Sequence, residues 1–290
     1  MIPPPVIKRY LKDVEDGNYD HYVDLSMSDF PLINPSQRIA LGLPNDGIGI
    51  MVANVEEDGS AGGILKTGDV LLAIDGLPVK SNGLINYDGE DVNMNEIVER
   101  KFAGDVIDLK IWRNKEAIET NVTLKRFLPY LIAARKYDEK PRYVMYAGLV
   151  FQPLDRNLMA AHNMKSLQVR YHFDSYVSSD IYKERPEVIV LTSILPDSIN
   201  SYFTQFSQSI VDKVNGIKVK NLTDVHSALS TNDAQYIVIN LLGSGRPIVI
   251  EKSKVKEAQQ RIQTKYNIIK DLSLIHISEP TRLRRISYAV

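Results

Sequence analysis

The chain has 290 residues, a formal net charge of −1, 44% apolar residues and no cysteine. Its length predicts roughly two domains, and the missing cysteine excludes disulfides, thiol catalysis and cysteine-bound zinc. A nearly neutral chain has no general attraction for nucleic acid or an anionic membrane, and no apolar run approaches the ~18–20 residues needed to cross a bilayer.

The first elements in chain order are a helix and a run of strands. Residues 6–14 predict a short amphipathic helix, since apolar residues recur there at helical spacing. That apolar face, formed by Val6, Ile7, Tyr10, Leu11 and Val14, needs a partner to cover it. The pattern then predicts strands at 48–55, 70–74, 106–112 and 118–124, with a helix at 94–102 before the last two.

The same order of elements then recurs beyond a mixed-charge connector. Strands are predicted at 188–191, 210–214, 236–242 and 247–251, with a helical turn at 199–206 and a helix at 223–230. The segment 75–79, which opens on Asp75-Gly76, aligns with 215–219, which opens on Asn215-Gly216. One internal duplication therefore explains most of the chain. The second copy carries an insertion of helical character at 155–187 and a final helix at 253–266.

Three motifs resemble a known family. The run Gly68-Asp69-Val70-Leu71-Leu72-Ala73-Ile74-Asp75-Gly76 is similar to the signature of protease-associated PDZ domains. Gly148-Leu149-Val150-Phe151 resembles the carboxylate-binding loop of that family, with valine in place of the usual middle glycine. The segment 2–11 resembles the end of the trypsin-like domain in Deg/HtrA serine proteases. Together they resemble the C-terminal tandem-PDZ region of the plant-type Deg branch and its bacterial relatives, over residues 2–270.

This resemblance implies a fold class and an order of domains. The expected fold is mainly β with α (α+β): two PDZ-like, partly open β-barrels or sandwiches, each with flanking helices. The expected parts are a protease-domain remnant at 1–17, a first PDZ domain at 18–127, a linker at 128–142 and a second PDZ-like domain at 143–270. Residues 273–282 resemble translated sequencing-adapter DNA, so 271–290 is expected to be a non-native tail. The alternative is a natural basic tail containing Arg282, Arg284 and Arg285.

The resemblance also implies a binding site in each copy. A PDZ domain adds a peptide strand to a sheet edge beside a helix, and a loop of consecutive backbone N–H groups receives the peptide carboxylate. Both loops lack the middle glycine, and a valine would be strained if that position needs positive φ. For Leu149 and Phe151, core packing is an equally favoured interpretation. The predicted peptide-binding residues are Leu25, Ser26, Met27 and Ile97 in the first copy, and Gly148, Leu149, Val150 and Phe151 in the second.

No catalytic or metal site is predicted in this chain. A serine protease triad joins a nucleophile, a histidine and an acid in one cleft, and none of the five histidines lies in such a setting. His226, on the predicted helix at 223–230, is read as a surface residue, with recognition of a ligand hydroxyl as the alternative. The acidic loop 87–93 lacks the spacing of a calcium-binding EF-hand. We therefore expect neither cofactor nor metal.

The sequence is compatible with three functions. The favoured one is a PDZ pair that binds peptides or unfolded protein segments and regulates substrate binding and homo-oligomerisation in a serine endopeptidase of protein quality control. The alternatives are a stand-alone adaptor for C-terminal peptides and a hydrolase with an unfamiliar site. The prolines at positions 3–5 do not resemble a signal peptide. The compartment is left open: the periplasm if the protein is bacterial and exported with an N-terminus missing here, and otherwise a soluble intracellular location.

Overall fold

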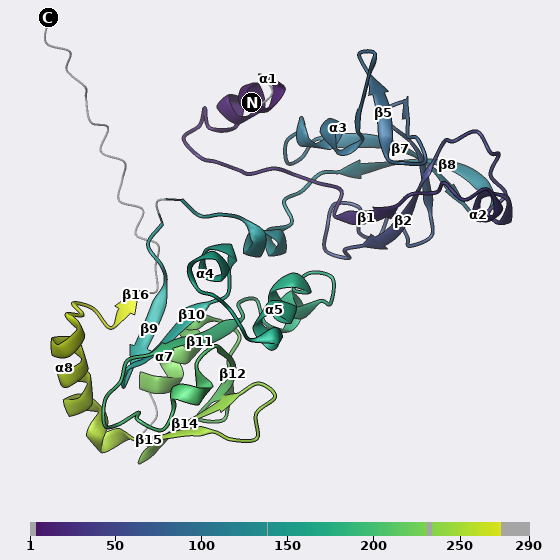
Figure 1. Cartoon of the computed structure of the whole chain (residues 1–290). Coiled ribbons are helices and arrows are strands. Elements are labelled where there is room, and N and C mark those ends of the chain that lie inside the picture. The colour runs from purple at the N-terminus through teal and green to yellow at the C-terminus, as the bar shows by residue number, and fades with distance from the viewer. Residues whose placement is uncertain (1–3, 138, 231–233, 274–290) are drawn as a thin grey trace, which may run out of the picture. The chain divides into compact units, whose positions relative to one another are not determined.

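The computed structural model describes residues 4–137, 139–230 and 234–273. They form two compact units that divide after Leu128 (Figure 1). Each unit is described by itself below, and the domain boundaries expected from the sequence stay predictions. Both units are mainly β-sheet with flanking helices, which confirms the predicted α+β class.

The first unit is built on one sheet. Its strands are β1 (Met27–Phe30), β2 (Ile50–Val55), β3 (Val70–Ile74), β4 (Leu77–Pro78), β7 (Val106–Arg113) and β8 (Glu116–Thr123). Their order is β1-β2-β3-β7-β8, with β4 beside β3, so β1 lies at an edge. A separate hairpin, β5 (Leu84–Tyr87) and β6 (Glu90–Asn93), projects from the unit in Figure 1. The helices are α1 (Pro4–Asp13), α2 (Pro35–Ala40) and α3 (Asn95–Glu99).

Alternating burial along the strands explains this sheet. On β7, the side chains of Ile107, Leu109 and Ile111 are buried and the residues between them are exposed, as the two-residue period of a strand requires. The predicted turn after β3 is formed by Asp75 and Gly76, whose φ angles are 45° and 79°. Two consecutive left-handed residues suit a tight hairpin.

Helix α1 forms where the sequence predicts a helix, and part of its apolar face is exposed. Its buried side chains are Arg9 and Asp13, whereas Ile7, Tyr10 and Leu11 are 45%, 46% and 57% exposed. The Arg9 guanidinium lies 4.5 and 4.7 Å from the ring centres of two aromatic residues and donates a 2.7 Å hydrogen bond to a backbone carbonyl. The polar side of α1 therefore holds it on the first unit. Arg9 makes these contacts to Tyr22, Phe102 and the His21 carbonyl.

The second unit repeats this sheet and extends it. Its strands are β9 (Tyr143–Tyr146), β10 (Leu149–Pro153), β11 (Ile189–Ile194), β12 (Ser209–Val214), β13 (Ile217–Lys218), β14 (Tyr236–Leu241), β15 (Ile248–Glu251) and β16 (Leu272–Ser273). Their order is β15-β14-β12-β11-β10-β9-β16, with β13 beside β12. Strands β10 to β15 thus match β1 to β8 in order. The second unit adds β9 and β16 at the edge that β1 leaves open in the first.

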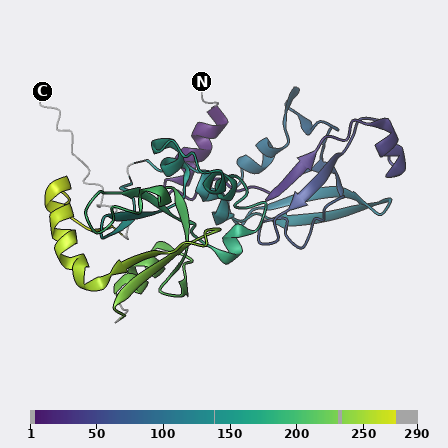
Figure 2. The ribbon, with the colours of Figure 1, turned by 60° about the horizontal axis from the view of Figure 1, so that its bottom comes forward.

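Helices fill the insertion and cover the second sheet. The insertion forms α4 (Arg156–Ala161), α5 (Leu167–Asp174) and α6 (Ile181–Glu184), whose apolar side chains share a second cluster with Val190 of β11 and Ile210 of β12. Helix α7 (Leu222–Ser230) follows β13, just as α3 follows the β4 to β6 region. Helix α8 (Val255–Tyr266) lies at the same end of the unit as β16 in Figure 1, and Figure 2 shows this helix in yellow beside the second sheet. Short 3-10 turns lie at Leu128–Ala133, Thr204–Phe206 and Lys252–Lys254.

The first residues of the expected non-native tail contact the second unit. Leu272 and Ser273 pair with β9, and Leu272 also packs against the core of the second unit. The backbone N–H of Met145 donates to the Asp271 carbonyl at 2.7 Å. The fold therefore extends through Ser273, three residues beyond the expected end at 270. The rest of the tail, 274–290, lies outside the described residues.

Candidate peptide-binding site

Strand β1 presents an unpaired edge in the first unit. The Ser26 carbonyl accepts a 2.9 Å hydrogen bond from the Glu56 N–H. Because antiparallel pairs alternate between bonded and non-bonded positions, the N–H and C=O of Met27 face away from β2. No strand among the described residues pairs with this outer edge. An open edge of this kind is a template for an added strand.

The residues predicted to bind peptide in the first copy are brought together. Leu25 and Ile97 belong to one buried cluster, and Met27 packs against it. Leu25 and Ile97 are only 3% and 7% exposed, whereas Met27 is half-buried. The remaining residues of β1 are exposed. The site is thus an open strand edge with an apolar floor, at which Met27 is the most accessible of the predicted apolar side chains.

In the loop that leads into β1, the Asp24 carboxylate accepts the hydrogen bonds of Ser26. Ser26 has a φ of 54°, the left-handed conformation that glycine adopts most easily. Asp24 Oδ1 accepts hydrogen bonds from the Ser26 N–H at 2.6 Å and from the Ser26 hydroxyl at 2.7 Å. Burial raises the pKa of the Asp24 carboxyl. The middle N–H of the loop is therefore already satisfied from within the chain.

Asp24 was not among the residues singled out from the sequence. The signal was present, because an aspartate two residues before a left-handed position often accepts that residue's N–H in a turn. Neighbouring groups hold the loop in place. The Ser26 hydroxyl accepts from the Ser60 N–H at 3.3 Å, and Ser60 Oγ bonds the backbone of Lys125. A Cβ added at Gly59 would lie 2.1 Å from the Ser26 Cβ.

In the second unit, the corresponding strand has no open edge. Leu149, Val150 and Phe151 pair with β9 on one side and with β11 on the other. The side chains of Leu149 and Phe151 are 0% exposed, in the core, and Val150 is half-buried. The left-handed positions of the β9–β10 turn are Ala147 and Gly148, with φ angles of 50° and 81°. Val150 lies in the strand without positive φ, so the strain considered from the sequence is not present.

Helix α8 covers the β9–β10 turn. Gln259 Oε1 accepts a 2.8 Å hydrogen bond from the Ala147 N–H, and Asn200 Nδ2 donates to the Ala147 carbonyl at 2.8 Å. A Cβ at Gly148 would lie 2.5 Å from Asn200 Nδ2 and 2.6 Å from the Leu195 carbonyl. The β9–β10 turn is therefore closely packed, and it is hydrogen-bonded to α8 through Gln259.

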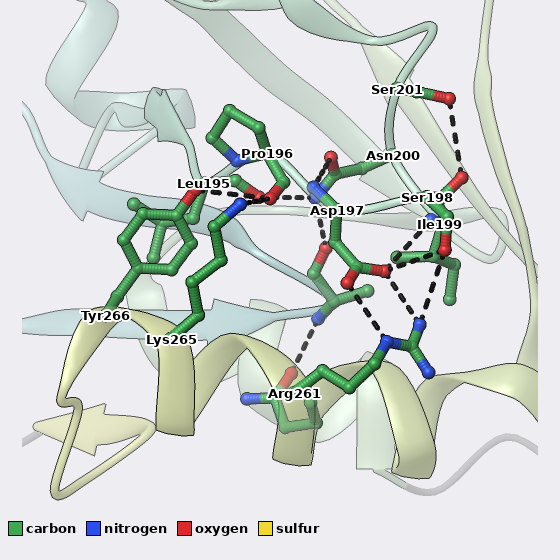
Figure 3. A network of polar contacts seen from close by, with 12 residues as sticks. Leu195, Pro196, Asp197, Ser198, Ile199, Asn200, Ser201, Arg261, Lys265 and Tyr266 are labelled. Atoms are coloured by element: carbon green, nitrogen blue, oxygen red, sulfur yellow. Dashed lines mark hydrogen bonds and ion pairs between the residues drawn. The ribbon is translucent and has the colours of Figure 1, made fainter.

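An ion pair fixes α8 to the loop after β11 (Figure 3). Arg261 Nη2 lies 2.8 Å from Asp197 Oδ1, and this arginine lowers the pKa of the Asp197 carboxyl to about 2. Lys265 and Tyr266 donate to the Pro196 carbonyl at 3.3 and 3.2 Å. The helix is thus held on the turn at several points along its length.

Within residues 4–137, 139–230 and 234–273, no group of three or more histidine, aspartate or glutamate side chains could hold a metal ion. Over the same residues, no helix is long and apolar enough to span a membrane. His226 is half-buried on α7. The acidic loop forms the β5–β6 hairpin, where Asp91 pairs with Lys80.

Comparison with known proteins agrees with the motifs. A family model described as a PDZ domain matches residues 132–274. A putative protease Do-like 13 of Arabidopsis thaliana is 27% identical over 270 residues, which cover 92% of this chain and 51% of the relative. A serine protease DegP homolog of Plasmodium falciparum is 28% identical over 242 residues, 71% of this chain and 27% of the relative.

Among solved structures, an HtrA-type protease AlgW with a decapeptide is 25% identical, with a TM-score of 0.29, over 42% of this chain and 35% of that chain. Two Arabidopsis relatives match 92% of this chain, and the chain spans about half of their length. The motif of the first copy agrees with these matches. Residues 132–274 match the PDZ-domain family, and the chain is similar along 92% of its length to Do-like proteases.

Proposed function

We propose that the first unit binds extended polypeptide segments by strand addition to β1, while the second unit serves an architectural role. One observation carries this proposal: β1 has an open edge, whereas β10 is paired on both sides. Two copies of one topology thus differ at the feature that strand addition requires.

The expected affinity depends on how many backbone hydrogen bonds β1 can offer to a ligand. Strand β1 has four residues, and each main-chain hydrogen bond contributes only ~0.5–1.5 kcal/mol net. Association itself costs ~4–15 kcal/mol. Apolar ligand side chains over Met27 must supply the rest, so we expect a Kd of about micromolar or weaker.

The relatives suggest the wider role. Since they are named as proteases, we infer that the whole protein is a serine endopeptidase of protein quality control. In it, the first unit would present unfolded segments to a protease domain, and the second would contribute to contacts between subunits. The helix at 4–13 would be the end of the protease domain, as the sequence of 2–11 indicates.

Hydrogen exchange distinguishes the two units. An apolar decapeptide in excess over the full chain should protect amides at 27–30 and leave those at 149–153 unchanged. The control is the same decapeptide N-methylated at alternate residues, which cannot form the ladder and should protect neither segment. Protection confined to 149–153, or none at either segment, would contradict the proposal.

A further inference from the structure

The loop before β1 raises a question about which ligands the first unit accepts. In a PDZ-type loop, consecutive N–H groups would receive the terminal carboxylate of a peptide. Here that loop is Leu25-Ser26-Met27. Its middle N–H donates to the Asp24 carboxylate at 2.6 Å, and the Ser26 hydroxyl donates to the same oxygen at 2.7 Å. An internal carboxylate thus occupies part of the position that a ligand carboxylate would need.

The surroundings of Asp24 do not neutralise it. Among the residues that the structure describes, no basic side chain forms an ion pair with Asp24, and its two donors, the N–H and hydroxyl of Ser26, are neutral. Lys125 lies opposite Asp24 in a backbone bridge, and the hydrogen bonds to the Asp24 carboxylate come from Ser26. A peptide carboxylate at this loop would therefore meet a like charge within a few ångströms, in a partly buried setting where repulsion is strong.

The packing of Ser26 also opposes any loop movement that would separate its N–H from Asp24. Ser26 is 2% exposed, its hydroxyl accepts from the Ser60 N–H, and its Cβ lies against Gly59. Ser60 in turn bonds both backbone groups of Lys125. Freeing the Ser26 N–H for a ligand would break contacts on several segments at once.

We propose that Asp24 is a specificity-determining residue which excludes free C-termini, so that the first unit takes internal extended segments of a polypeptide. This inference rests on the proposed function of β1. It concerns only the end of the groove: the open edge pairs with ligand backbone, and the loop rejects a terminal carboxylate. A ligand whose chain continues, or whose end is neutral, carries no charge to Asp24 and is accepted.

Matched peptides test this directly on the full chain. Three peptides share one apolar decapeptide sequence: one ends in a free carboxylate, one in an amide, and one continues through four uncharged polar residues to an amide. Fluorescence anisotropy at neutral pH measures their affinities. The wild-type chain should bind the amide and the extended peptide equally, and the free acid no more tightly than either.

The isosteric variant Asp24→Asn removes the charge and keeps an oxygen to accept from Ser26. It should improve binding of the free acid relative to the amide by about tenfold, the effect of removing one close like charge, with the amide peptide unchanged. Asp24→Ser is a second variant that retains a capping oxygen, and circular dichroism verifies the fold of both. Asp108→Asn, an exposed carboxylate on β7, changes the net charge equally and should leave the ratio unaltered.

The outcomes separate the two proposals. A wild-type chain that binds the free acid tenfold more tightly than the amide overturns the role of Asp24 while leaving strand addition intact. An unchanged acid-to-amide ratio in both folded Asp24 variants does the same. A wild-type chain that binds the amide but not the extended peptide overturns internal-segment recognition. If no peptide binds the wild type or either variant, the proposed function fails and this inference fails with it.

Discussion

Replacing Phe151 with alanine tests whether this residue is core or ligand pocket. Its ring is 0% exposed and lies in the main buried cluster of the second unit, on a strand paired with β9 and β11. Truncation of a buried phenylalanine costs ~3–5 kcal/mol, from lost burial and the cavity left behind. A domain of this size is stable by only about 5–15 kcal/mol, so Phe151→Ala should remove a large part of that stability.

The expected change in melting temperature is large enough to measure. At ~2–4 °C per kcal/mol for a domain of this size, Phe151→Ala should lower the melting temperature of the second unit by about 6–20 °C. Circular dichroism melts should be fitted with two transitions, since a two-unit chain need not unfold in one step. Val150→Ala is the matched control: its side chain is half-buried and should cost about 1 kcal/mol or less. A Phe151→Ala protein that melts like the wild type but loses peptide affinity would refute the core assignment.

Three further predictions concern other parts of the fold. A chain ending at Lys270 should melt at a lower temperature than one ending at Ser273, because only the longer chain keeps β16 on β9; equal melts would show that this pairing contributes nothing. Gly59→Ala should destabilise the first unit by ~1–3 kcal/mol, because its Cβ would lie 2.1 Å from a side-chain carbon of the loop, whereas Gly245→Ala, with open space around it, should be neutral in the same urea titration. Asp197 has a folded pKa near 2, below the ordinary value of 3.8, so its contribution is complete above pH 3.8 and is lost as the pH falls through about 2; Asp197→Asn should flatten that part of the stability–pH curve, and an unchanged slope would contradict the ion pair's role.

The sequence predicted the features that short-range patterns encode. The alternation of Ile107, Leu109 and Ile111 identified a strand, and the pairs Asp75-Gly76 and Asn215-Gly216 identified two tight turns. All four turn residues have positive φ. These features depend on neighbours within a few positions, so one sequence is enough to recognise them.

Features that depend on distant partners were not predicted. The spacing in 6–14 predicted a helix with an apolar face, but not that Arg9 holds this helix through aromatic rings whose proximity only the folded chain reveals. The segment Tyr143–Tyr146 was not identified as a strand at all. This strand pairs with β10 on one side and with β16 on the other. The strands β9 and β16 lie more than a hundred residues apart in the sequence.

The same reasoning explains why the two copies could not be distinguished by their motifs. The loop motif of the second copy is the closer match to a carboxylate-binding loop, yet its residues Leu149 and Phe151 are core and its strand has no free edge. The first copy has the weaker loop motif and the open edge. Whether a strand can accept a ligand is decided by what lies beside it, and two short segments, β9 and β16, make that difference here. A variant that deletes β16 and weakens the hold of β9 should therefore move the second unit toward the open arrangement of the first, which hydrogen exchange at 149–153 would reveal as faster exchange and, with added peptide, as new protection.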